Sequence, residues 1–127
     1  MTQGILRLSG LILAGMTAAA HVFIGTYDTL LPLLASELAP MVKGTFHACW
    51  HFVSIFLVFS VWSFFRKAPY ASHLAMLWIG FSVCFVLAGV TAAGVRGLLV
   101  LPQWIFLGLA GLLMVFSLEK PANIQNR

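Results

Sequence analysis

Two histidines, His47 and His51, stand four residues apart in the apolar stretch HACWHFVS, which covers residues 47–54. Residues four apart are neighbours on one face of a helix, so the two imidazoles point the same way if this stretch is helical. Neutral imidazole is a common metal ligand, and it titrates near neutral pH. The pair therefore indicates either a binding site or a polar cluster that satisfies its own hydrogen bonds.

A third histidine, His21, lies at a comparable depth in the preceding apolar segment. With helices expected over residues 5–25 and 45–65, the rise of about 1.5 Å per residue puts His21 roughly 6 Å inside the outer end of its helix. That level falls between those of His47 and His51. We therefore expect the three rings to meet near the outer mouth of a helix bundle.

Such a cluster has several possible uses. Three imidazoles with one open position suit Zn²⁺ or copper, and an added carboxylate suits iron. Haem b is another option, with one histidine from each helix holding the iron from opposite sides. Proton or quinone handling and a purely structural hydrogen-bonded cluster are the alternatives. We predict that His21, His47 and His51 bind a metal ion or haem.

The elements that position these rings follow from the composition. Of the 127 residues, 61% are hydrophobic and only 8% are charged, whereas a soluble domain carries about 25% charged residues. Long uncharged runs reach the roughly 20 residues that a bilayer-spanning helix needs. We predict an all-α, integral membrane four-helix bundle that forms a single transmembrane domain over residues 1–127. Its helices are expected at about 5–25, 45–65, 72–95 and 98–118.

Basic residues gather on one side of the membrane if four helices cross it in turn. Five of the seven basic residues then share a side, and the positive-inside rule makes that side cytoplasmic, together with both termini. The five are Arg7, Arg66, Lys67, Lys120 and Arg127. The basic residues form no cluster suited to nucleic acid, so we do not expect nucleic acid as a partner. We predict localisation in the bacterial cytoplasmic (inner) membrane.

The connections and helix faces are also predicted. Residues 26–44 are expected to be a long connection that contains a short interfacial helix from about Pro32. Stripes of small residues mark surfaces where membrane helices approach closely. One such stripe is expected in the first helix and another in the third; they are Gly10, Ala14 and Ala18, and Gly80, Cys84, Ala88 and Ala92. The N-terminal segment also resembles a secretory signal with Ala18-Ala19-Ala20 before a cleavage point, but we expect a retained helix.

No Ser-His-Asp pattern, CxxC pair, phosphate-binding loop or dinucleotide fingerprint is present, so we do not expect enzyme activity of the chain by itself. The favoured function is a small membrane protein with an outer-side histidine cluster for a metal ion or haem, working as a membrane subunit of a redox complex. A cofactor-free structural or assembly subunit is one alternative, and an oligomeric small transporter or channel is another. Expected partners are the lipid bilayer and other membrane subunits or further copies of the chain.

Overall fold

The computed structural model describes residues 3–118, and every regular element in this part of the chain is a helix. The first long helical segment, here called the first rod, consists of four elements in succession. They are the α-helix α1 (Gln3–Ala19), the π-helices η1 (Ala20–Ile24) and η2 (Thr26–Leu30), and the short α-helix α2 (Leu31–Ala35). The other elements are α3 (Pro40–Arg66), α4 (Ala71–Ala93), the 3₁₀ turn η3 (Gly94–Arg96), α5 (Gly97–Val100) and α6 (Gln103–Leu118).

Three rods are long and apolar enough to cross a membrane, and they cover Gln3–Ala35, Pro40–Arg66 and Ala71–Val100. The apolar helix α6 is shorter, with 16 described residues. At about 1.5 Å per residue, all three rods match or exceed the roughly 30 Å of a hydrocarbon core. The all-helical class and the membrane character predicted from composition are therefore supported.

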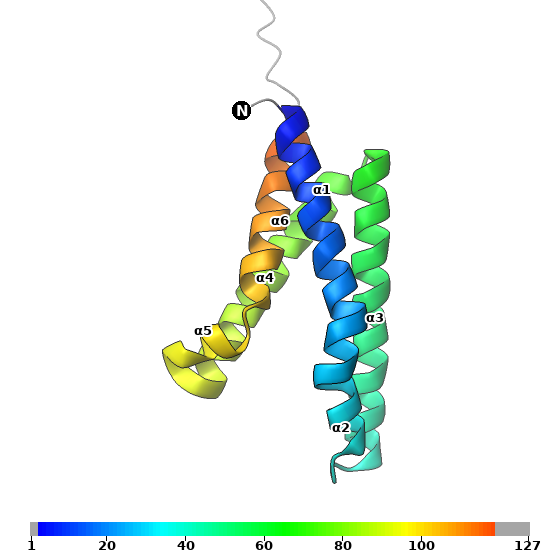
Figure 1. The fold of residues 1–127 in the computed structure, drawn as a ribbon, viewed down its shortest axis with the longest axis vertical. Coiled ribbons are helices and arrows are strands. Elements are labelled where there is room, and N and C mark those ends of the chain that lie inside the picture. The colour runs from blue at the N-terminus through cyan, green and yellow to red at the C-terminus, as the bar shows by residue number, and fades with distance from the viewer. Residues whose placement is uncertain (1–2, 119–127) are drawn as a thin grey trace, which may run out of the picture.

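The helices pack in two arms (Figure 1). The first rod lies along α3, and α4 lies along α6, while α1 also packs against α6. The arms meet at the end that carries the start of α1 and the α3–α4 turn, and they diverge toward the other end. The part of the first rod beyond α1 therefore has α3 as its main neighbour among the described elements.

The core sits where the arms meet. Phe64, Trp78 and Met114 are its largest fully buried side chains, and they come from α3, α4 and α6. Small buried residues lie between them, namely Ala14, Ala18, Ala71, Ala75 and Ala110. Without a hydrophobic driving force in lipid, close packing of such small residues holds membrane helices together.

The connection predicted over residues 26–44 is much shorter in the structure, because the first rod continues to Ala35 and α3 begins at Pro40. Pro32 is the residue that favoured a break. Its ring crowds the carbonyl four residues earlier, and it donates no backbone hydrogen bond. The chain accommodates it by placing Pro32 in the first turn of α2, directly after the π-helical turn of η2.

The small-residue stripe predicted for the first helix is confirmed, because Gly10, Ala14 and Ala18 are buried. The stripe predicted for the third helix is wrong, since Gly80, Cys84, Ala88 and Ala92 are exposed. The buried positions of α4 are Ala71, Ala75, Trp78, Ser82 and Gly89. The close approach is made instead from α6, where a Cβ on Gly111 would lie 2.8 Å from the Ala75 carbonyl oxygen.

Candidate functional site

His21 lies against α3 in the half of the first rod that extends beyond the core. Its ring stacks on the Trp50 indole, with ring centroids 4.2 Å apart and planes 19° from parallel. Its Nε2 lies 3.2 Å from Ser54 Oγ and 3.5 Å from the Trp50 carbonyl oxygen. The predicted inward orientation of His21 is therefore correct, and its partners are one aromatic ring, one hydroxyl and one backbone carbonyl.

The hydrogen bonds of Ser54 fix which nitrogen of His21 carries the proton. Ser54 Oγ donates its only hydrogen to the Trp50 carbonyl oxygen, at 2.9 Å. Both groups that face Nε2 of His21 are therefore acceptors, and Nε2 must be the donor. The lone pair of the neutral ring then lies on Nδ1, for which residues 3–118 supply no hydrogen-bond partner.

The backbone around His21 is unusual. The ring belongs to η1, and η2 follows after Gly25. π-helical turns are rare, and they occur frequently at functional sites. Gly25 also approaches this indole closely, since a Cβ added there would lie 2.8 Å from Trp50 Cη2. The Trp50 ring thus packs against both His21 and Gly25 of the first rod.

His47 and His51 form a second group on α3. Their ring centroids are 4.8 Å apart with planes tilted by 43°, and both side chains are exposed. Metal–nitrogen bonds of about 2.0–2.1 Å put the centroids of two imidazoles on one ion about 5 Å apart. The spacing of this pair therefore suits two ligands of one metal ion.

The structure does not assemble the predicted set of three histidines into one ligand group. Among the described residues, no group of three or more His, Cys, Asp or Glu side chains could hold a metal ion. His21 faces Trp50 and Ser54, whereas His47 and His51 lie on an exposed face of α3. A binding role for all three remains a prediction.

Three other polar residues lie apart from this region or on its surface. Asp28 and Glu37 are exposed, and His73 is exposed at the start of α4, near the opposite end of the molecule. Sequence reasoning missed Trp50 as a packing partner because aromatic residues near helix ends usually serve as interfacial anchors. A signal for this contact was present in the sequence. His21 and Gly25 are four residues apart on the first rod, and Trp50 and Ser54 are four residues apart on α3, so each pair lies on one helix face.

Comparison of this chain with protein-family models, with curated proteins and with solved structures finds no match.

Proposed function

We propose that this chain is a small integral membrane protein in which His47 and His51 hold one metal ion, and that it serves as a membrane subunit of a redox complex. The observation that carries the proposal is the 4.8 Å spacing of two exposed imidazoles on one face of α3. Polar side chains within membrane helices are costly, so a pair that finds no other polar partner within residues 3–118 favours a bound ligand. Imidazole suits Zn, Cu and Fe, and a redox role favours the last two.

The depth of the histidines supports the same site. If Arg7 and Arg66 mark one membrane boundary, His21 and His51 both lie about 21–23 Å from it, at about 1.5 Å per residue. Both then fall in the far third of a core about 30 Å thick. In the proposed arrangement four helices cross the bacterial inner membrane with both termini in the cytoplasm, so the metal lies on the outer side.

Two histidines are half of a four-coordinate donor set, so further ligands must come from elsewhere. The arm that carries His47 and His51 diverges from α4 and α6, which leaves this part of α3 accessible (Figure 1). A partner subunit or a second copy of the chain can supply the remaining donors there. His21 is not a ligand in this arrangement. It is expected to act indirectly, because it stacks on Trp50 and so holds in place the residue next to His51.

Haem has less support than a single ion. The haem option takes one histidine from each of two helices, bound on opposite sides of the iron, whereas His21 of the first rod stacks on Trp50 and contacts Ser54. A Soret absorption band in the purified protein would nevertheless establish haem and replace the single-ion proposal.

Elemental analysis of protein purified in mild detergent tests the proposal directly. The variants are His47→Ala and His51→Ala, and the matched control is His73→Ala, which removes an exposed histidine at the other end. We expect about one metal ion per site in the wild type and in the control. Loss of one ligand is expected to weaken retention by on the order of tenfold or more.

Equal metal content in all four proteins would refute a site at His47 and His51. A metal-free, colourless wild type with normally folded variants would favour a cofactor-free assembly subunit. Flux through liposomes that contain the purified protein would favour the transporter or channel alternative.

A further inference from the structure

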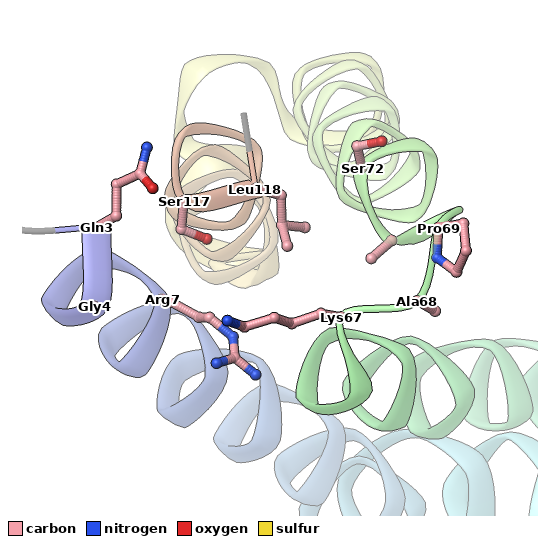
Figure 2. A pocket seen from close by; sticks show the side chains of 10 residues that line it. Gln3, Gly4, Arg7, Lys67, Ala68, Pro69, Ser72, Ser117 and Leu118 are labelled. Carbon is pink, nitrogen blue, oxygen red and sulfur yellow. The ribbon is translucent and has the colours of Figure 1, made fainter. Parts of the chain in front are cut away.

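A cavity of about 420 Å³ opens at the end where the two arms meet, opposite His21, His47 and His51 (Figure 2). It is lined by the start of α1, the α3–α4 turn, the start of α4 and the end of α6. Its polar side chains include Gln3, Arg7, Lys67, Ser72 and Ser117. Leu118 and the α3–α4 turn add apolar surface to the lining. The cavity therefore offers both charged and apolar contacts.

Two cations face this cavity, and no carboxylate of residues 3–118 lines it. Figure 2 shows the Arg7 and Lys67 side chains reaching toward each other from α1 and from the end of α3. None of the described lining residues is Asp or Glu. Two like charges directed at one space repel each other unless an anion lies between them.

The hydrogen bonds of Arg7 leave part of its guanidinium unused. Nη2 donates to the Phe65 carbonyl oxygen at 2.7 Å and approaches the Phe64 carbonyl oxygen at 3.5 Å, which ties α1 to the end of α3. Nε is buried and has no acceptor within residues 3–118. The ammonium of Lys67 likewise has no hydrogen bond or ion pair in this part of the chain. Both positive charges are therefore available to an anion.

The first turn of α4 strengthens the positive field. Ala71 and Ser72 line the cavity, and no side chain caps this helix start. The N–H of Ala71 donates to the Ala68 carbonyl oxygen at 2.9 Å, so it is the helix dipole that makes this end favourable for negative charge. This contribution adds to that of the two cations, which carry the argument.

We infer that this cavity binds a phosphate group, and that its source is the headgroup of an acidic phospholipid. Arginine and lysine are the usual phosphate-binding side chains. The cavity lies at the end of rods that are long and apolar enough to cross a membrane, where the headgroups of a surrounding bilayer would be found, and its apolar lining suits the glycerol and upper acyl region of a lipid. The inference does not depend on the metal site, which lies at the other end of the molecule.

Native mass spectrometry of the full chain in detergent tests the inference, with phosphatidylglycerol as the anionic probe and phosphatidylcholine as the zwitterionic control. The informative variant is Lys67→Gln, because Arg7 also holds helices together. Arg66→Gln is its matched control, since Arg66 is the adjacent exposed cation and does not line the cavity. We expect Lys67→Gln to weaken phosphatidylglycerol binding by on the order of tenfold, as loss of a charged hydrogen bond does, and Arg66→Gln to leave it unchanged.

Equal weakening by the two variants would overturn the inference, because binding would then reflect general surface charge. A second arm titrates inorganic phosphate against the protein freed of lipid, followed by ³¹P NMR. Binding of inorganic phosphate that depends on Lys67, without selective retention of phosphatidylglycerol, would overturn the lipid source. Selective, Lys67-dependent retention of phosphatidylglycerol would support it.

Discussion

A single methyl group at Gly25 tests the packing that positions His21. Gly25 has φ −62° and ψ −29°, which is ordinary right-handed helical backbone, so alanine fits there without strain. The added Cβ would lie 2.8 Å from Trp50 Cη2 and 3.0 Å from Cζ2. Carbon atoms prefer separations of about 3.5–4.0 Å, so the indole would have to move by about 0.7 Å or more. The stacking of Trp50 on His21 would change with it.

The expected energy follows from two opposing terms. Overpacking costs typically about 1–3 kcal/mol, and replacing glycine by alanine within a helix gains roughly 0.5–1 kcal/mol. Gly25→Ala is therefore expected to destabilise the protein by up to about 2.5 kcal/mol. Gly15→Ala in the same rod is the control, because a Cβ there would have no neighbour within 4 Å. The control is expected to be unchanged or more stable.

Equilibrium unfolding in mixed micelles, followed by circular dichroism as SDS is added, measures both variants. A double-mutant cycle with Trp50→Leu sharpens the test, because the Gly25→Ala penalty should vanish once the indole is gone. We expect a coupling free energy of about 1 kcal/mol or more, since contacting residues couple by roughly 0.5–3 kcal/mol. Equal effects at Gly15 and Gly25, together with no coupling to Trp50, would refute the packing described here.

Three further predictions concern the helix contacts and the topology. Gly111→Ala is expected to cost about 1–3 kcal/mol of unfolding free energy, because its Cβ would meet the Ala75 carbonyl oxygen; Gly80→Ala, with open space around it, is the control in the same SDS titration. Arg7→Met is expected to cost about 1.5–3 kcal/mol through lost charged hydrogen bonds, against about 0.5 kcal/mol or less for exposed Arg66→Met, and equal losses would contradict the role of Arg7. In a background without the native cysteines, Glu37→Cys is expected to react with a membrane-impermeant maleimide in intact cells, and labelling only after lysis would reverse the proposed topology.

The membrane helices were predictable because charges are so sparse in this chain. The uncharged runs placed the rods, and the spacing of Gly10, Ala14 and Ala18 identified the buried face of α1. The end of the first rod was not predictable by the same means. Pro32 normally interrupts a helix, and nothing in the sequence indicates the π-helical turns that let the chain continue through it.

The partners of each face were harder to predict than the rods. Glycine and alanine at a spacing of four suggested that Gly80 and Cys84 lie inward, whereas both are exposed. The contact depends on the neighbouring helix, and Gly111 of α6 approaches the side of α4 that carries Ala75. A periodicity within one helix identifies a possible interface, but only the complementary surface of a second helix decides which face is used.

In the candidate site too, the helix faces were predictable from the sequence and the contacts between helices were not. The sequence correctly placed His47 and His51 on one face and His21 on an inward face. It did not predict that the Trp50 indole would occupy the space beside His21. Depth along two helices could be derived from residue counts, but the rotation of one helix against the other could not, and that rotation sets His21 opposite Trp50 and Ser54.

Pulsed electron paramagnetic resonance of the protein loaded with Cu²⁺ in lipid nanodiscs tests the metal proposal most directly, because it counts imidazole nitrogens bound to the ion. We predict at least two coordinated imidazoles in the wild type, one fewer in His47→Ala and in His51→Ala, and no change in His73→Ala. A wild-type spectrum without imidazole coupling, or one that is unaltered in both His47→Ala and His51→Ala, would contradict the proposal.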